Sequence, residues 1–283
     1  MARITRSGRA ALRSEAMRFL AQHGFLRPPL PPSQALAARN IEVAQLSLDD
    51  LLVKVNLPAE DRQGIQAMLD TQAREVVFRI GLPEQKRSWG SLHEIGHEFI
   101  QWQRELLYCC PLLLLPARIQ DQFEAEADIF AAEAFFFGDK FNKLAQEGDL
   151  SLVTAQQLAE TVYETSLHAT FVHYVRESEF PCCLLVWRPA NNNGSPGTSD
   201  ELVLHYYVKS SSFTGHIDTG QIADADDVIA KIFKDPKLGG VIRHEITLAS
   251  KTGKAFSVDA ESFSNSYNVF TLIRQPQRLS AAA

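Results

Sequence analysis

The most informative stretch for chemistry is residues 91–100, SLHEIGHEFI, which contains an HExxH motif. Residues four apart on a helix share one face, so His93 and His97 would present two imidazoles to one point. Neutral imidazole nitrogen is a common ligand of Zn²⁺. Glu94 stands beside them and is expected to be the catalytic base that takes a proton from a zinc-bound water. The motif therefore predicts a hydrolytic zinc site on one helical face.

Residues 121–137 supply a candidate third ligand. Glu124 and Asp128 are four residues apart and would share a helical face, with alanines on the same side that permit close helix packing. Glu124 would complete a His₂Glu ligand set and leave the fourth position to water, as catalytic zinc requires. Asp128 is expected to hold the outer nitrogen of a ligand histidine. Glu126 points to another side of the helix and is the alternative metal ligand.

The competing interpretation is a chance motif beside a solvated acidic helix face. Gly96 argues against it, because glycine inside a helix costs about 0.5–1 kcal/mol relative to alanine. Its presence within the motif indicates that a neighbouring element approaches closely. Together the two segments predict one Zn²⁺ per chain.

The arrangement resembles the ImmA/IrrE family of metallopeptidases, within the wider gluzincin-like group. The resemblance covers roughly residues 8–137: a first helix, a "PP" segment at 25–29, a strand pair, a charged approach at 86–92 to HExGH, and ExEAxxFA at 124–131. It departs at 135–138, where Phe-Phe-Phe-Gly replaces the family's frequent Leu-Met-Pro run. The resemblance implies a zinc-dependent endopeptidase with a narrow protein substrate, typically a helix-turn-helix transcriptional repressor cut in a stress or mobile-element response.

Two further functions are compatible with the residues. One is a non-proteolytic regulatory protein that keeps the zinc fold but binds a repressor or DNA. The other is a ligand sensor whose output is the peptidase. The retention of Glu94 favours hydrolysis, since a pure binding protein does not need that base. The sequence assigns no oxyanion donor, because His168, His173, Tyr163 and Tyr174 have equal claim.

Composition is typical of a globular protein with two domains. The chain has 283 residues, 45% of them hydrophobic and 22% charged, and a formal net charge of −6. That charge argues against non-specific nucleic-acid binding by the whole chain. The arginine-rich start has no apolar core of a secretory signal, and the apolar run 106–115 is too short to span a bilayer. We expect a cytoplasmic protein in which this run is a buried connector.

Four cysteines occur as two adjacent pairs, Cys109-Cys110 and Cys182-Cys183. Adjacent cysteines do not match zinc-finger spacing, so buried free thiols are expected in a reducing compartment.

The predicted fold class is α+β, and residues 1–138 form its mainly helical zincin-like peptidase domain. Expected elements are a helix at 8–23, a short helix capped by Ser33, and strands at 41–43, 65–69 and 76–80, with a turn at 70–73. An edge strand beside a zinc-binding helix is a natural place for an extended peptide to pair, although a purely structural hairpin has the same pattern.

Residues 139–180 are expected to form a helix-turn-helix-like bridge, with helices at 154–161 and 167–176 and Ser166 starting the second. Its second helix offers few side chains that read DNA bases, so direct DNA binding is not expected. Ala169, Val172 and Val175 have the spacing of its core face.

Residues 181–283 are predicted to form a C-terminal α/β domain with an antiparallel sheet. Strands are expected at 182–187, 202–208, 241–248 and 255–258, and a helix at 226–233 capped by Asp224 or Asp226. Some relatives carry a GAF-like sensor domain at this place, which is an analogy of architecture alone.

Overall fold

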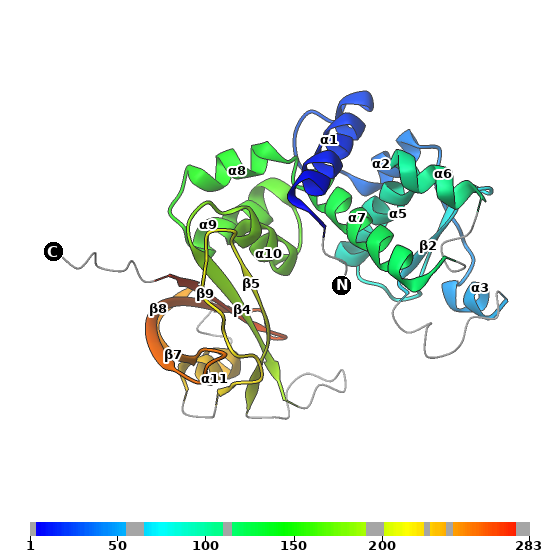
Figure 1. The fold of residues 1–283 in the computed structure, drawn as a ribbon. Coiled ribbons are helices and arrows are strands. Elements are labelled where there is room, and N and C mark those ends of the chain that lie inside the picture. The colour runs from blue at the N-terminus through cyan, green and yellow to red at the C-terminus, as the bar shows by residue number, and fades with distance from the viewer. Residues whose placement is uncertain are drawn as a thin grey trace. The chain divides into compact units, whose positions relative to one another are not determined.

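The computed structural model divides the chain into two compact units (Figure 1). The first unit contains Met1–Phe141 together with Val162–Glu164, and the second contains Asn142–Thr161 and Thr165–Ala283. The residues that the structure describes are 4–54, 65–109, 115–190, 201–223, 227–235 and 240–275. Helices and strands occur in both units, which confirms the predicted α+β fold class. The three domain boundaries drawn from the sequence stay a prediction.

The first unit is mainly helical. Its helices are α1 (Arg6–Gln22), α2 (Pro32–Ala38), α3 (Leu48–Lys54), α5 (Glu84–Phe99), α6 (Gln101–Cys109), α7 (Ala117–Phe135) and the start of α8 (Asp139–Gln146). The side chain of Thr5 caps α1 by accepting a hydrogen bond from the backbone N–H of Gly8 at 3.1 Å. Gly24 follows the last turn with a φ of +72°, a conformation in which glycine is favoured. The helix predicted at 8–23 is thus present, and its buried side chains are those of Leu12, Ala16, Phe19 and Leu20.

Helices α5 and α7 are in close contact, as Gly96 predicts. A Cβ atom at Gly96 would lie 3.3 Å from the Cα of Ala127 and 3.1 Å from a ring carbon of Phe130. The rings of Phe19, Phe99 and Phe130 have centroids 5.4–5.8 Å apart and form the core between α1, α5 and α7. The absence of a side chain at residue 96 therefore sets the separation of the two helices.

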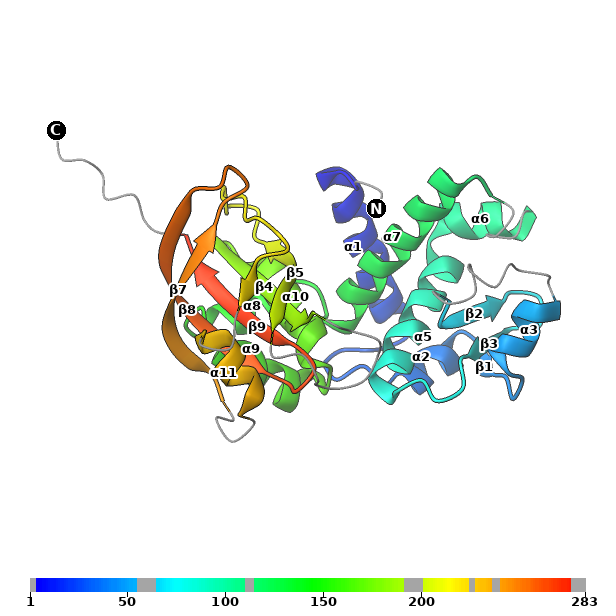
Figure 2. The ribbon, with the colours of Figure 1, turned by 90° about the horizontal axis from the view of Figure 1, so that it is seen from below.

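A small mixed sheet lies beside α5 (Figure 2). Its strand order is β1 (Glu42–Val43), β3 (Glu75–Phe78), β2 (Ala67–Asp70). β1 pairs with β3 in parallel and β2 pairs with β3 antiparallel, so β2 is an edge strand. The carboxylate of Asp70 accepts hydrogen bonds from the backbone N–H groups of Gln72 and Ala73, each at 2.9 Å. This confirms the predicted turn at 70–73.

Two expectations for this unit are corrected. The N-cap of α2 is Pro31, without a side-chain hydrogen bond, and Ser33 lies inside the first turn. A proline in the first turn of a helix does not cost a helical hydrogen bond, because the N–H that it lacks would have no partner within the helix there. The buried connector expected at 106–115 is only partly found, since Leu115 is buried but Leu106 on α6 is 37% exposed. Residues 110–114 of that run lie outside the described residues.

The second unit contains the rest of α8, from Asn142 onward, followed by α9 (Leu152–Gln157), which continues into a π-helical segment, Leu158–Tyr163. Together α9 and the π-helical segment form the first helix predicted for the bridge. The end of the π-helical segment belongs to the first unit, where the Tyr163 ring lies 5.4 Å from those of Phe136 and Phe141. The second predicted helix is α10 (Leu167–Glu177), and its N-cap is Ser166 as expected.

Helix α10 packs on the sheet of the second unit. The ring of Phe171 makes edge contacts with Phe263 and Phe270, at centroid distances of 5.9 and 5.3 Å. The core face expected from the sequence is only partly right, since Ala169 and Val172 are half-buried while Phe171 is fully buried. The bridge is thus held on its sheet by aromatic packing.

The second unit contains a six-stranded antiparallel half-barrel. Its strand order is β6 (Ile222–Ala223), β5 (Leu202–Lys209), β4 (Cys182–Pro189), β9 (Val269–Arg274), β8 (Ala255–Ser264), β7 (Ile242–Ala249). The four predicted strands are present, β8 is longer than expected, and β9 is not among the predicted strands. Helix α11 (Val228–Lys234) is capped by Asp227, whose carboxylate accepts from the N–H of Ile229 at 2.8 Å. The caps expected from the sequence, Asp224 and Asp226, lie outside the described residues, and the cap that the structure shows is Asp227.

Both faces of β4 are buried. Cys183, Leu185 and Trp187 belong to the core that includes α11, and the side chains between them point to the opposite face. Cys182 and Cys183 are buried free thiols, as predicted, and burial raises the pKa of both.

Candidate metal centre

Helices α5 and α7 bring together the three predicted metal ligands. Nε2 of His93 lies 3.1 Å from Oε2 of Glu124 and 3.1 Å from Nε2 of His97. Nε2 of His97 lies 3.6 Å from Oε1 of Glu124. The two histidines lie one helical turn apart on α5, and Glu124 lies on the facing side of α7. The contact at Gly96 brings these two helices close together.

These separations fit a tetrahedral metal ion. Zinc bonds of about 2.0–2.1 Å in tetrahedral geometry place ligand atoms about 3.3–3.4 Å apart. The Nε2 atoms of His93 and His97 lie 3.1 Å apart, and the Glu124 carboxylate places one oxygen 3.1 Å from the first of them and its other oxygen 3.6 Å from the second. Two imidazole nitrogens and a carboxylate oxygen also match the donor types that Zn²⁺ accepts in catalytic sites. The group can therefore hold a metal ion, and its donor set fits zinc.

Asp128 and Glu126 occupy the surroundings of this group in different ways. Oδ1 of Asp128 lies 3.0 Å from Nδ1 of His93, the nitrogen that faces away from the ligand cluster. This is the contact that the spacing of Glu124 and Asp128 predicts. The carboxylate of Glu126 instead accepts a hydrogen bond from the indole N–H of Trp102 at 2.7 Å. The structure thus brings Glu124, and not the alternative ligand Glu126, to the histidines.

The electrostatics of the cluster favour a positive charge between the ligands. Burial lowers the pKa of His93, but hydrogen bonds with Asp128 and Glu124 outweigh burial and raise this pKa to about 10. Burial raises the pKa of Glu124, yet its hydrogen bonds with His93 and His97 dominate and hold the pKa well below its ordinary value. A metal cation would take the place of the proton that His93 otherwise carries.

Glu94 is buried beside the ligand cluster. Burial raises the pKa of its carboxyl, and the nearby His97 and His93 partly oppose this rise. A backbone hydrogen bond from Leu69, on the edge strand β2, acts in the same direction as the histidines. A raised pKa brings a carboxylate closer to the range in which a general base works at neutral pH.

Gln103 is a site residue that the sequence pattern does not reveal. Its Oε1 lies 2.7 Å from Nδ1 of His97, and the side chain is completely buried on α6. Ile100 separates α5 from α6 with an extended backbone conformation, so helical spacing from His97 does not apply to Gln103. In the sequence, only the presence of a glutamine shortly after the HExxH motif could have suggested this contact with His97.

Two of the side chains considered as oxyanion donors have other partners. Nε2 of His168 forms a short hydrogen bond with the hydroxyl of Tyr206. The hydroxyl of Tyr174 donates to the backbone carbonyl of Asp149 at 3.1 Å. No oxyanion donor is assigned.

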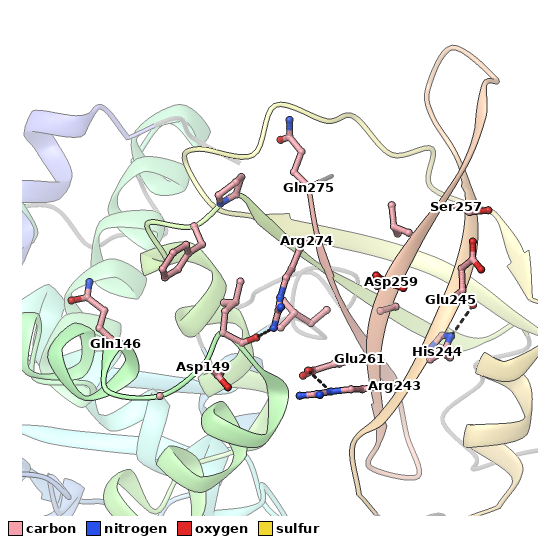
Figure 3. A pocket seen from close by; sticks show the side chains of 17 residues that line it. Gln146, Asp149, Arg243, His244, Glu245, Ser257, Asp259, Glu261, Arg274 and Gln275 are labelled. Carbon is pink, nitrogen blue, oxygen red and sulfur yellow. Dashed lines mark hydrogen bonds and ion pairs between the residues drawn. The ribbon is translucent and has the colours of Figure 1, made fainter. Parts of the chain in front are cut away.

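The second unit has a recess of about 1280 Å³ lined by strands β7–β9 and the segment before α9 (Figure 3). Glu261 is its central buried charge. The carboxylate accepts hydrogen bonds from Oγ of Ser151 at 2.6 Å, from the N–H of Leu152 at 2.9 Å and from Arg243 at 3.2 Å. This charge is therefore used within the fold, where it attaches the start of α9 to the sheet.

No family model and no curated protein matches the chain. Among solved structures, the fold is similar to that of a Mycobacterium tuberculosis transcriptional regulator, with a TM-score of 0.56 and 12% sequence identity. The similarity covers 93% of this chain and 86% of that chain. At this identity it shows the fold alone. In the part of the chain that the structure describes, no helix has the length and apolar character needed to cross a bilayer.

Proposed function

We propose that the protein is a zinc-dependent endopeptidase whose active site lies between α5 and α7. The observation that carries the proposal is the convergence of His93, His97 and Glu124, whose ligand atoms all lie within 4.8 Å of one another. A bound Zn²⁺ would polarise the scissile carbonyl and lower the pKa of a water molecule.

The remaining residues support the chemistry of hydrolysis. Glu94 would accept a proton from the attacking water at its carboxylate and pass it to the leaving amine. Its burial and raised pKa suit both steps. Asp128 would hold the His93 ring in the orientation that leaves Nε2 available as a ligand.

The edge of β2 offers a place for an extended substrate. The backbone N–H of Arg79 donates to the backbone carbonyl of Gln66 at 2.9 Å, and hydrogen-bonded pairs alternate along an antiparallel ladder. Ala67 and Leu69 therefore direct their backbone groups away from β3, towards the outer edge of β2. Because Leu69 also bonds to Glu94, a peptide that pairs with this edge would lie beside the general base.

The test is peptide hydrolysis by the purified chain loaded with Zn²⁺. Glu94→Gln should keep stoichiometric zinc and lose about 10²–10⁴-fold in turnover, the usual contribution of a general base. Glu105→Gln is the matched control, because Glu105 is an exposed glutamate on the neighbouring helix α6. Full activity in Glu94→Gln would overturn the mechanism.

The proposed substrate is a helix-turn-helix repressor in the cytoplasm, and its cleavage would belong to a stress or mobile-element response. Support comes from the family resemblance of residues 8–137 and from the likeness to a structure described as a transcriptional regulator. Comparison of protein N-termini in cells expressing the wild type and Glu94→Gln would identify the substrate. A new terminus inside a repressor, present only with the wild type, is the expected result.

The second candidate is a regulatory protein that uses the same fold without proteolysis, by binding a repressor or DNA. The likeness to a transcriptional regulator is the observation that favours it. If no terminus differs between the two strains under several stresses while a repressor co-purifies equally with both, this second function is correct.

A further inference from the structure

A buried amide stands behind one of the ligand histidines. Oε1 of Gln103 lies 2.7 Å from Nδ1 of His97. The Nε2 group of the same amide donates to the backbone carbonyl of Phe123 at 3.1 Å and to the carboxylate of Glu126 at 2.8 Å. Both of these partners only accept hydrogen bonds, so the amide of Gln103 has one possible orientation.

This orientation decides which nitrogen of His97 carries the proton. An amide oxygen accepts hydrogen bonds and does not donate them, so Nδ1 of His97 must carry the hydrogen that lies between the two groups. In the neutral ring Nε2 then holds the free lone pair. That nitrogen is the one that lies 3.1 Å from His93 and 3.6 Å from Glu124. The amide thus selects the tautomer that can bind a metal.

Glu126 holds the amide in place. Besides Gln103, its carboxylate accepts from the indole N–H of Trp102 at 2.7 Å and from Nε2 of Gln122 at 2.8 Å. The residue is 6% exposed, so these three donors replace the water that would otherwise solvate the charge. Glu126 therefore forms a fixed anchor on α7, and one of its bonds fixes the amide of Gln103.

We infer that Gln103 is a positioning residue of the metal centre and that Glu126 acts on His97 through it. The inference rests on the proposed function, because it requires a metal at Nε2 of His97. Outer partners of ligand histidines typically contribute about 10–100-fold to metal affinity. His93 and His97 thus receive different supports, a carboxylate for the first and a neutral amide held by a carboxylate for the second.

The experiment measures Zn²⁺ affinity of the full chain by competition with a chelator, and the visible d–d spectrum after Co²⁺ substitution. Gln103→Leu keeps similar side-chain bulk but removes the acceptor, and it should bind Zn²⁺ about 10–100-fold more weakly with an altered Co²⁺ spectrum. Gln101→Leu is the matched control, because Gln101 is an exposed glutamine on the same helix whose amide donates to Glu105. The control should show wild-type affinity and spectrum.

A second pair of variants tests the role of Glu126. Glu126→Gln keeps an oxygen that accepts from Trp102 and Gln103, so affinity should stay within about threefold of the wild type. Glu126→Leu removes that acceptor and should weaken binding by about tenfold or more. If Glu126 were itself a ligand, Glu126→Gln would lose zinc as severely as Glu126→Leu.

The outcomes separate this inference from the proposed function. A wild-type chain that binds neither Zn²⁺ nor Co²⁺ would overturn the metal centre itself. A wild type that binds both, together with unchanged affinity and spectrum in Gln103→Leu, would overturn the positioning role alone. If Gln103→Leu does not fold, equal Zn²⁺ affinity in Glu126→Leu and the wild type would overturn it.

Discussion

The two units use buried or partly buried carboxylates in opposite ways. In the candidate metal centre, the side chain of Glu124 is 50% exposed and its partners are two histidines that together with it could hold a metal ion. In the half-barrel, the side chain of Glu261 is 9% exposed, and a hydroxyl, a backbone N–H and an arginine saturate it. A carboxylate whose partners are fixed donors contributes to stability. A carboxylate whose partners are histidines, which can lose a proton, remains available to bind a cation.

The largest expected effect is the loss of a metal ligand. Glu124→Ala should weaken Zn²⁺ binding by more than about 100-fold, beyond the range for outer partners, because it removes one of three protein ligands. Glu261→Leu, in the other unit, should leave the affinity unchanged. Chelator competition measures both. Stoichiometric zinc in Glu124→Ala, together with its loss in Glu126→Ala, would show that the ligand is Glu126.

The second prediction concerns the stability of the half-barrel, to which the carboxylate of Glu261 is expected to contribute. Glu261→Leu should destabilise the half-barrel by about 2–4 kcal/mol, since it leaves the hydroxyl of Ser151 and the N–H of Leu152 buried without their acceptor. Amide hydrogen exchange of β8 and β9 measures the loss in that unit. Glu245→Leu is the control, because this glutamate is exposed on the same recess and its replacement should change stability by no more than about 0.5 kcal/mol. Equal effects of the two changes would remove the distinction between the units.

The third prediction concerns pH. In the metal-free protein the pKa of His93 is about 10, so at neutral pH a proton occupies the site and the metal must displace it. Glu124, whose pKa is lowered, is already ionised and releases none. Zn²⁺ affinity should therefore rise with pH, by about tenfold per unit from His93 alone. Asp128→Asn removes a group that raises this pKa and should flatten the dependence, and titration calorimetry in two buffers measures the proton release.

The smallest effect is expected at the helix contact. Gly96→Ala should destabilise the first unit by about 1–2 kcal/mol, because the new Cβ would lie 3.3 Å from the backbone of Ala127, which cannot move aside. Gly90→Ala, on the same helix, is the control. Its Cβ would meet a ring carbon of Phe78 at 3.3 Å, and a side chain can tilt away. Denaturant unfolding of both variants provides the measurement, and a stabilised Gly96→Ala would contradict the close contact.

Helical spacing predicts much of the metal centre. His93, His97, Glu124 and Asp128 lie on regular helices, so a period of 3.6 residues is enough to place each pair on one helical face. Gln103 follows an interruption of the helix at Ile100, and its partner depends on tertiary packing. The convergence of His93, His97 and Glu124 and the contact of Asp128 with His93 could thus be predicted from the sequence, whereas the contact of Gln103 with His97 could not.

In the half-barrel, strand prediction from the sequence fails for a different reason. Strand β9 (Val269–Arg274) is buried on both faces from Val269 to Ile273, so its sequence lacks the alternation that marks a half-exposed strand. The sequence also does not determine which residue caps α11, since Asp224, Asp226 and Asp227 all lie within the four positions before the helix. Their residue type indicates a cap, but only the backbone geometry selects Asp227.

The position of β4 in the middle of the half-barrel determines the redox chemistry of its two thiols. Neighbouring side chains of a strand project from opposite faces, so the buried sulfur of Cys183 lies in the core beside α11 while the buried sulfur of Cys182 projects from the other face of the sheet. A disulfide between them would require the chain to leave its hydrogen bonds with β5 and β9. Oxidants that act on the folded protein therefore encounter two isolated and shielded thiols, and formation of a vicinal disulfide would report that the half-barrel has opened.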